Sequence, residues 1–536
     1  MHTKALLWFL VLSFLVFSSA SSVAAAQRKT PSKPDESCYE CHEQIKTLKV
    51  GTKHATVACS TCHAQLDGHL ANPEQKPETN LELSLCGRCH PSQYETYLST
   101  NLKSKAKVEK GTTTSRSPTF DKLMTPHGFT KEHDEPRSHA FMVIDHFIVD
   151  RAYGGTFQLK SRKDITRPGA IWDVVIETGK ELPQTARAAN SVCLTCKTTD
   201  TILKWPYMGD SNPATDLKRG GNPAAMAMAK QYIKNPMGCI HCHDPHGTRP
   251  RVVRDALIEA VVDRGEGTYP YDKEKSQKTT MTKVEFERDG KPFRAVALLN
   301  KPDSNLLCAQ CHVEYNCNPG FDPKTGAAIG MDDRRANYFS WANVFDIQKK
   351  YAEIGFKDFR HAVTGAPLTK LQHPEGETFW GSKHEKAGVE CKDCHMPKAR
   401  DKRGRTFTFH GQRSARYMLR DTCTRCHKYW TQEEAEYQVD AIQNYIRGKM
   451  RKAEFWLGQF IDTYVRARDL GVKNDTLKEA GQYHEKAHIL WEWWTAENSD
   501  GFHNPDAARE SLAQSVNASQ EGIKFLEKAM EERRKP

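Results

Sequence analysis

Cys193-Leu-Thr-Cys-Lys197 places two cysteines three positions apart and a lysine directly after them. Seven other segments of the 536-residue chain repeat this spacing with histidine as the last residue. Two cysteines so spaced form thioether bonds to one porphyrin, and the next side chain ligates its iron. The sequence therefore predicts eight covalent c-type haems, one of which has a primary amine in place of the proximal imidazole.

The eight predicted sites use sixteen of the seventeen cysteines and leave Cys317 over. Disulfide bonds or zinc sites are the alternatives. Both are disfavoured because histidine or lysine follows every pair directly. The expected attachment residues are Cys38, Cys41 and His42; Cys59, Cys62 and His63; Cys86, Cys89 and His90; Cys193, Cys196 and Lys197; Cys239, Cys242 and His243; Cys308, Cys311 and His312; Cys391, Cys394 and His395; and Cys423, Cys426 and His427.

The beginning of the chain has the features of a secretory signal peptide. Lys4 precedes an apolar run from Leu6 to Phe17, and Ala24-Ala-Ala26 forms an A-x-A cleavage site. A bilayer span takes about 20 residues, more than this run offers. We expect cleavage near Ala26 and a periplasmic protein, with an uncleaved anchor as the alternative.

The formal net charge of +11 at pH 7 would by itself permit nucleic-acid binding. Each haem brings two propionates, however, and processing removes Lys4. We therefore expect an assembled protein close to neutrality and no nucleic-acid partner.

The distribution of attachment sites predicts the domains. After the signal peptide (1–26), three sites fall within an N-terminal module, 27–120, which is too short to have much core without its haems. A catalytic domain, 121–430, carries the other five sites. Residues 431–536 have none and show the apolar spacing of helices.

We predict a mainly α fold that is organised on eight haems and has little β structure. Apolar spacing predicts a helix over 433–470, about 57 Å long at 1.5 Å per residue, a second over 476–497, and a third after Asn504. The first helix would pack against another subunit or cover the haems. A β-hairpin is expected over 279–299.

Several other histidines are candidates for the second axial position of a haem. A single histidine is more often a surface residue, but seven haems in need of a second imidazole raise the odds of ligation. His54 and His384 lie just ahead of attachment sites. The candidates are His54, His139, His361, His384, His410 and His503.

The haem with Lys197 is the candidate catalytic centre if its other face carries no histidine. An amine is a stronger σ-donor than imidazole, which favours electron donation from iron to a bound nitrogen oxide. An anionic substrate needs cations and hydrogen-bond donors, and Arg137, Tyr315 and His373 are candidates. Spacing alone leaves open that these three residues are scattered over the fold.

Longer motifs resemble those of the pentahaem cytochrome c nitrite reductases. The resemblance is carried by Cys308-Ala-Gln-Cys-His-Val-Glu-Tyr315, Lys370-Leu-Gln-His-Pro-Glu375, Cys391-Lys-Asp-Cys-His-Met-Pro397 and the lysine motif, over about residues 135–510. The three N-terminal sites, and Cys317 two residues after Tyr315, are still more similar to the octahaem nitrite reductases.

The resemblance implies roles for the candidate residues. Lys197 would be the proximal ligand of the active-site haem, with Arg137, Tyr315 and His373 on its distal side. A thioether bond would join Tyr315 to Cys317, where the residues alone predict a free, buried cysteine. Arg137 lies about sixty residues before Lys197, as in octahaem rather than pentahaem enzymes.

The resemblance also implies a structural calcium ion. Its ligands would be the side chains of Glu314 and Gln372 and the carbonyl oxygens of Tyr315 and Lys370. All four are oxygen ligands, as a hard cation requires.

The implied activity is six-electron reduction of nitrite to ammonium, with hydroxylamine and sulfite as further substrates. Electrons would come from a redox partner protein or a quinol-linked cytochrome, and a homo-oligomer is expected. One alternative is an octahaem hydroxylamine oxidoreductase, against which Lys197 argues because the active haem of those enzymes has a histidine. The other is a non-catalytic electron-transfer protein in which all eight haems are six-coordinate.

Overall fold

The computed structural model of this protein describes residues 36–100, 119–127, 138–144, 157–159, 175–177, 191–200, 233–264, 281–288, 291–330 and 333–535. The expected signal peptide and Arg137 lie outside these residues, and for Cys193 only the backbone is described. No described helix combines the length and the apolar composition needed to cross a membrane.

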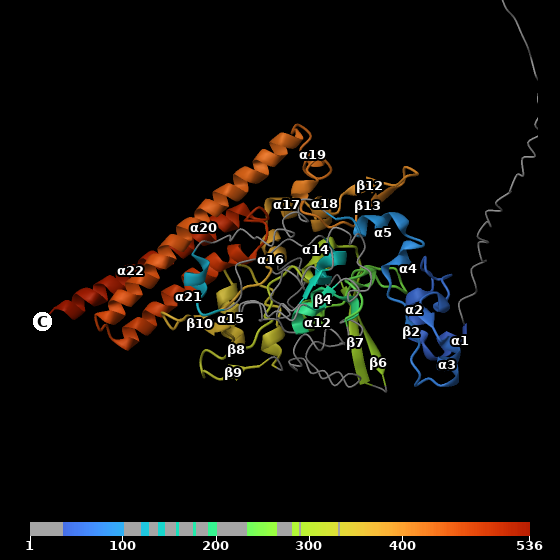
Figure 1. Ribbon diagram of the computed structural model, residues 1–536, viewed down its shortest axis with the longest axis horizontal. Coiled ribbons are helices and arrows are strands. Elements are labelled where there is room, and N and C mark those ends of the chain that lie inside the picture. Colours follow the sequence, from blue (N-terminus) through green and yellow to red (C-terminus); the bar gives the residue numbers. More distant parts are fainter. Residues whose placement is uncertain are drawn as a thin grey trace, which may run out of the picture.

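The described chain is mainly helical, as predicted. Three long helices form one side of the molecule, and the short helices of the N-terminal module lie on the opposite side (Figure 1). The long helices are α20 (Gln432–Asp469), α21 (Asn474–Ala496) and α22 (Pro505–Arg534). The other helices named here are α1 (Glu36–Cys41), α2 (Glu43–Lys49), α3 (Leu66–Ala71), α4 (Leu83–Gly87), α5 (Pro91–Tyr97), α7 (Phe120–Met124), α12 (Asp255–Ile258), α14 (Ser304–Ala309), α15 (Ile347–Ile354), α16 (Glu375–Phe379), α17 (Lys383–Lys386), α18 (Cys391–His395) and α19 (Cys423–Cys426).

Local sequence signals explain the ends of the long helices. Thr431 caps α20, because its side chain accepts a hydrogen bond from the backbone N–H of Glu434, whose carboxylate accepts one from the N–H of Thr431. Gly471, with φ of 82°, follows the end of this helix. Asn504 caps α22 and Pro505 occupies its first turn. These bounds confirm the three helices expected from apolar spacing.

The three long helices pack on one another and on the catalytic domain. α20 and α21 both contact α22, and Trp491, Trp493 and Trp494 of α21 are buried. The indole N–H of Trp493 donates to Thr378 Oγ1 of α16 at 2.8 Å. Because α16 follows directly after His373, the helical region is fixed against the candidate active site.

The β structure is confined to short antiparallel pairs and one small sheet. The expected hairpin is confirmed as β6 (Met281–Arg288) and β7 (Lys291–Leu299), which β5 (Arg251–Val252) extends in the order β5-β7-β6. The remaining pairs are β1 (His63–Ala64) with β2 (Glu78–Thr79), β3 (Phe157–Leu159) with β4 (Val175–Glu177), β8 (Gly320–Phe321) with β9 (Ala328–Ile329), β10 (Phe359–Arg360) with β11 (Pro367–Leu368), and β12 (Lys398–Arg400) with β13 (Thr406–Thr408).

The N-terminal module has a small apolar core. Within residues 36–100, the buried hydrophobic side chains are Tyr39, Ala58, Leu83, Tyr97 and Leu98. So small a number of buried apolar side chains is consistent with a segment that is held together by its cofactors. The module also contacts the catalytic domain, since the hydroxyl of Tyr97 donates to the carbonyl oxygen of Met237 at 2.6 Å. The domain boundaries at 120 and 430 stay predictions.

Candidate haem cluster and active site

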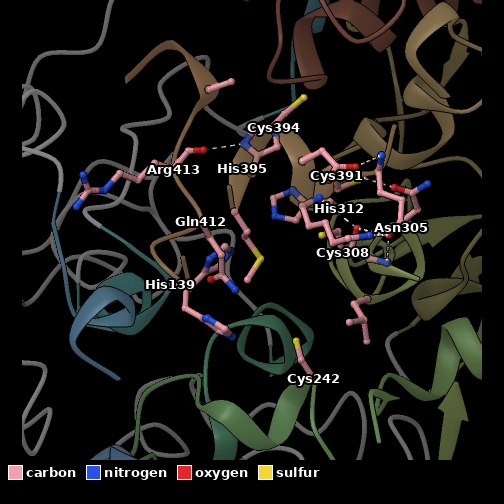
Figure 2. Close-up of a pocket in the computed structure, with 18 of the residues that line it drawn as sticks. His139, Cys242, Asn305, Cys308, His312, Cys391, Cys394, His395, Gln412 and Arg413 are labelled. Atoms are coloured by element: carbon pink, nitrogen blue, oxygen red, sulfur yellow. Dashed lines mark hydrogen bonds and ion pairs between the residues drawn. The ribbon is translucent and has the colours of Figure 1, made fainter. Parts of the chain in front are cut away.

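One connected cavity of about 1810 Å³ runs among the attachment motifs. A pocket for a single small ligand measures about 300–1,000 Å³, so this space fits several large groups. Both cysteines and the histidine line it at the sites that begin with Cys86, Cys239, Cys308, Cys391 and Cys423, and Cys62, Cys196 and Lys197 join them. Figure 2 shows His139, His312 and His395 converging on one part of it.

Several motifs fold as a single helical turn, which explains their spacing. The backbone N–H of His312 donates to the carbonyl oxygen of Cys308 at 3.0 Å, and His90 and His427 repeat this bond to Cys86 and Cys423. Residues at positions i, i+3 and i+4 of such a turn share one face. Both cysteines and the axial ligand therefore point to the same porphyrin.

The lysine motif forms a 3₁₀ turn, as the first residues of the motifs at Cys59 and Cys239 also do. Residues Ser191–Cys196 form a 3₁₀ helix, and the N–H of Lys197 donates to the carbonyl oxygen of Leu194 at 2.9 Å. Lys197 still lines the cavity. It thus shares this lining with the histidines of five other motifs.

Six proximal histidines face a second histidine at a nearly constant separation. Two imidazoles on opposite sides of one iron have ring centres about 6.2 Å apart, given metal–nitrogen bonds of about 2 Å and about 1.1 Å from the nitrogen to the ring centre. The observed separations are 6.0 Å for His42 and His69, 6.3 Å for His90 and His54, 6.4 Å for His243 and His410, 6.1 Å for His312 and His139, 6.3 Å for His427 and His384, and 6.3 Å for His395 and His503.

Five of the six expected distal histidines thus lie near a proximal histidine, at separations that fit two ligands of one iron. His361 is the exception. Its Nε2 lies 3.0 Å from the carbonyl oxygen of Lys122, and its ring centre lies 4.7 Å from that of His484, away from the cavity lining. The expectation of a ligand role for His361 is not supported, because its Nε2 already has a backbone partner. His69, which sequence reasoning missed, takes a distal place.

Oxygen atoms orient five of these twelve histidines through Nδ1. Nδ1 lies 2.7–2.9 Å from a carbonyl oxygen in four rings and 2.7 Å from a carboxylate in a fifth. A partner on Nδ1 leaves Nε2 for a metal and fixes the ring, the usual arrangement of ligating histidines. The partners are Pro245 for His54, Gln75 for His69, Arg413 for His395, Thr408 for His410 and Glu497 for His503.

The sulfur atoms of neighbouring motifs come together in pairs. Cys86 lies close to Cys239, Cys196 to Cys311, and Cys308 to Cys391. Porphyrins bonded to these sulfurs would meet edge to edge. The motifs therefore have the close spacing that electron tunnelling between haems requires.

Tyr315, Cys317 and His373 line the same cavity as Lys197. The rings of Tyr315 and His373 are 6.3 Å apart and inclined by 27°, and Tyr315 and Cys317 are both buried. The structure thus brings together three of the four predicted active-site side chains and the predicted crosslink partner. Arg137, the fourth, lies outside the described residues.

His373 shares the carboxylate of Glu375 with the neighbouring haem ligand. Its Nδ1 lies 3.9 Å from Glu375 Oε1, and Nδ1 of His312 lies 3.4 Å from Oε2. The ring centres of His312 and His373 are 6.5 Å apart. Because both rings turn Nδ1 to the same carboxylate, they lie side by side rather than across one iron.

Burial shifts the pKa values of this pair. It lowers the pKa of His373 to about 4, against the opposing charge of Glu375. Burial alone would raise the pKa of Glu375, but the hydrogen bond from His312 and the charge of His373 lower it to about 2. At pH 7 a neutral imidazole therefore sits beside a carboxylate. Glu375 ends one of the motifs that carry the family resemblance, but the sequence alone assigns it no role.

The predicted calcium ligands surround a buried carboxylate. Glu314 accepts hydrogen bonds from the hydroxyl of Tyr351 at 2.6 Å and from the N–H of Gln372 at 2.6 Å. Among described residues, the side-chain nitrogen of Gln372 and Oε2 of Glu377 are buried without a hydrogen-bond partner. A carboxylate has about four lone-pair sites, so Glu314 keeps capacity for a cation.

The described residues contain no group of three histidine, cysteine or acidic side chains arranged for a metal ion. The predicted calcium site does not require one, because two of its four ligands are backbone carbonyl oxygens. Burial raises the pKa of Glu314 well above its usual value. A bound cation would offset that cost of ionisation.

Arg254 is a further residue that sequence reasoning missed. It is 3% exposed, its Nη1 donates to Thr195 Oγ1 of the lysine motif at 2.6 Å, and its guanidinium lies 5.0 Å from the ring centre of Phe339. Its Nε and Nη2 have no hydrogen-bond partner among the described residues. The guanidinium therefore holds the motif and keeps two donors for an anionic group such as a haem propionate.

Comparisons with known proteins bear on the family and the fold. The family model described as Cytochrome c552 matches residues 82–534. A cytochrome c-552 of Parabacteroides distasonis is 26% identical over 430 residues, which cover 79% of this chain and 72% of that protein. A cytochrome c-552 of Haemophilus influenzae is 24% identical over 451 residues, covering 79% and 69%.

A solved structure supports the fold. The catalytic subunit of cytochrome c nitrite reductase from Desulfovibrio desulfuricans, described for its two calcium sites, is similar with a TM-score of 0.56 and 23% identity. The similarity covers 84% of this chain and 87% of that one. It confirms the predicted mainly helical fold with long C-terminal helices.

Proposed function

This chain belongs to the cytochrome c552 family, and we propose that it is an octahaem enzyme that reduces nitrite to ammonium. The observation that carries the proposal is the shared position of Lys197, Tyr315, Cys317 and His373 on one cavity, while six histidine motifs have a second histidine opposite them. Seven attachment sites would relay electrons, and the Lys197 site would bind substrate.

The reaction is NO₂⁻ + 6 e⁻ + 8 H⁺ → NH₄⁺ + 2 H₂O. The haem at Cys193, Cys196 and Lys197 would supply an iron for the substrate nitrogen and the six electrons. The protein residues must then bind an anion and deliver protons where oxygen leaves.

His373 is placed to donate such a proton. Asn498 Nδ2 lies 3.3 Å from Nδ1 of His373 and also donates to the carboxylate of Glu375, which fixes the nitrogen of the amide on this side. Nδ1 therefore accepts, and the proton of the neutral ring sits on Nε2. The Nε2–H group would donate a hydrogen bond, and then a proton, to an oxygen of the substrate. A positioned general acid of this kind accelerates a reaction by about 10²–10⁴.

Tyr315 and Arg137 complete the proposed site. The phenol of Tyr315 would donate a second hydrogen bond, and a thioether bond to Cys317 would hold its ring. Arg137 would supply a planar cation suited to a two-oxygen anion. Glu314, Gln372 and the Tyr315 and Lys370 carbonyl oxygens would hold a calcium ion that braces the segment carrying His373.

The cellular setting follows from the same proposal. A signal peptide cleaved near Ala26 would deliver the chain to the periplasm, where a redox protein or a quinol-linked cytochrome would donate electrons. Tyr437, Tyr445 and Phe455 are exposed on α20, which supports a homo-oligomer formed through this helix. Hydroxylamine and sulfite would be further substrates.

An assay of the purified holoprotein tests the activity. With a reduced dye as electron source, each nitrite consumed should yield one ammonium. The oxidised protein should show a high-spin ferric signal from one haem, which nitrite or cyanide shifts. Consumption of nitrite without ammonium, or eight low-spin haems, would remove the proposal and favour an electron-transfer protein.

A further inference from the structure

The backbone at the lysine ligand is bonded to the segment that leads into the next attachment site. The carbonyl oxygen of Lys197 accepts from the N–H of Met237 at 3.1 Å, and the N–H of Thr199 donates to the carbonyl oxygen of Pro236 at 3.2 Å. The N–H of Lys197 donates to the carbonyl oxygen of Leu194 at 2.9 Å. The backbone from which the ligand side chain extends is therefore held on two sides.

The carboxylate of Asp200 ties the same two segments together. It is 3% exposed, and its Oδ2 accepts from the backbone N–H groups of Lys234 at 2.7 Å and Asn235 at 2.6 Å. Its Oδ1 accepts from the side-chain amide of Asn235 at 3.0 Å. Hydrogen bonds to an ionised acceptor are stronger than those between neutral groups, and here they offset the cost of burying the carboxylate.

Thr198 adds a second tie between the two segments. Its hydroxyl donates to the carbonyl oxygen of Asn235 at 2.6 Å and accepts from the N–H of Asp200 at 3.1 Å. Two of the three residues that follow Lys197 thus bind residues 234–235 through their side chains. The place of the lysine backbone depends on these contacts between distant parts of the chain.

A lysine ligand depends on its backbone more than a histidine ligand does. An imidazole has a second ring nitrogen that a partner can hold, as the carbonyl oxygen of Arg413 holds His395. The amine of Lys197 has only one nitrogen, on a flexible four-carbon stem. A proton also competes with a metal for such a nitrogen, since ligands must be deprotonated to bind. A displaced backbone would therefore loosen an amine where it would leave an imidazole in place.

We propose that Asp200 is a positioning residue for the catalytic haem: it fixes the backbone of Lys197 so that the amine stays on the iron. In this scheme the carboxylate acts only through the ligand. The alternative is that it merely supports the fold, in which case its loss would affect an imidazole at position 197 equally. The inference rests on lysine ligation in the proposed function, and its test needs no nitrite turnover.

The reduction potential of the haem whose spectrum responds to cyanide gives the test. Asp200→Ala should retain eight haems by pyridine haemochrome assay but raise that potential, because an amine donor stabilises ferric iron and a loosened amine does so less. We expect a rise of about 59 mV or more, which corresponds to a tenfold change for a one-electron couple. Asp200→Asn should restore most of the parent potential, since its amide oxygen can still accept from the N–H groups of Lys234 and Asn235.

A double-mutant cycle separates positioning from support of the fold. In the Lys197→His background, Asp200→Ala should shift the potential much less, because a rigid ring needs less from the backbone to stay on the iron. Equal shifts in the two backgrounds, or no shift in the protein with Lys197, would overturn the proposal. A Lys197→His haem with the parent potential would remove the lysine ligand itself, and the proposed function with it.

Thr198→Val covers the case in which Asp200→Ala does not accumulate. It keeps the shape of the side chain and removes the hydroxyl that donates to Asn235, so the potential should move in the same direction. Thr463→Val is the matched control, because Thr463 is buried in α20 and its hydroxyl donates to the carbonyl oxygen of Gln459 at 2.9 Å. The control should leave the potential unchanged, and a parent potential in Thr198→Val would then refute the assignment.

Discussion

Asn498 Nδ2 lies 3.3 Å from Nδ1 of His373 and donates at the same time to the carboxylate of Glu375. One amide thus sets the tautomer of the imidazole in the candidate active site. Glu375 also accepts from His312, so the same carboxylate supports a haem ligand and an acid–base residue. In the proposed scheme, this network places the proton of the neutral His373 ring on Nε2.

Replacement of this ring tests its role directly. His373→Ala should lower nitrite turnover by roughly 100-fold or more, because a positioned acid–base group contributes about 10²–10⁴. The haem spectrum should not change, since His373 ligates no iron in this scheme. His361→Gln, also a buried histidine, serves as the control and should keep turnover close to the parent value. Turnover within a fewfold of the parent in His373→Ala would contradict the assignment.

Lys197 is tested by restoring the common motif. Lys197→His should retain covalent haem, because the cysteines are unchanged, but slow nitrite reduction by about tenfold or more, a barrier change of at least about 1.4 kcal/mol. Stopped-flow reduction of the relay haems should be unaffected. If the variant turns over nitrite as fast as the parent, the amine has no special role.

Much of the haem arrangement could be predicted from the sequence, because each attachment site is one continuous turn. Spacing and the residue after the second cysteine identified Cys308, Cys311 and His312 without any tertiary information. The signals that predict helix α20 are equally local, since its apolar period, its threonine cap and Gly471 all lie along one segment.

The distal ligands could not be predicted with the same certainty, because their partners lie far away in the chain. His69 belongs to no recognised motif, and only its ring position near His42 suggests a ligand role. His361 was one of the candidate distal ligands, yet its Nε2 faces a backbone carbonyl oxygen. Only the folded structure distinguishes a buried histidine with a carbonyl partner from one directed at a porphyrin.

The predicted bond between Tyr315 and Cys317 has a mass signature. Joining the two side chains removes two hydrogens, so the peptides carrying them should migrate as one species about 2 Da lighter than their sum. Cys317→Ser should abolish that species and leave eight haems. An uncrosslinked parent protein, with both peptides at full mass, would exclude the bond and leave Cys317 a buried thiol.

Calcium should depend on the single carboxylate of its proposed site. Glu314→Gln keeps the size of the side chain and removes its charge, so bound calcium measured by elemental analysis should fall, and the melting temperature with it. Added calcium should stabilise the parent and not the variant, because a ligand stabilises only the state that binds it. Equal calcium content in parent and variant would place the ion elsewhere.

Acid should weaken the contact between α21 and the catalytic domain. Burial lowers the pKa of His361 to about 4 and that of His484 well below its usual value, with the hydrogen bond of His361 to Lys122 opposing its shift. Both rings are neutral when folded and charge on unfolding, so the unfolded chain binds more protons below about pH 6.5. The stability that they contribute is present above that pH and is lost as the pH falls toward 4, with a slope of about 1.4 kcal/mol per pH unit for each ring.

The difference in stability between the parent and a variant separates the effect of His484 from the titration of the haem propionates, which both proteins share. His484→Gln retains a hydrogen-bonding group for Thr364, whose hydroxyl lies 2.7 Å from Nδ1 of His484, but cannot charge. Denaturant unfolding of parent and variant at pH 7 and pH 5 should therefore show a smaller loss of stability for the variant. Parallel losses would mean that His484 is protonated in the folded protein. Its complete burial and the neighbouring rings of His361 and His488 make that unfavourable.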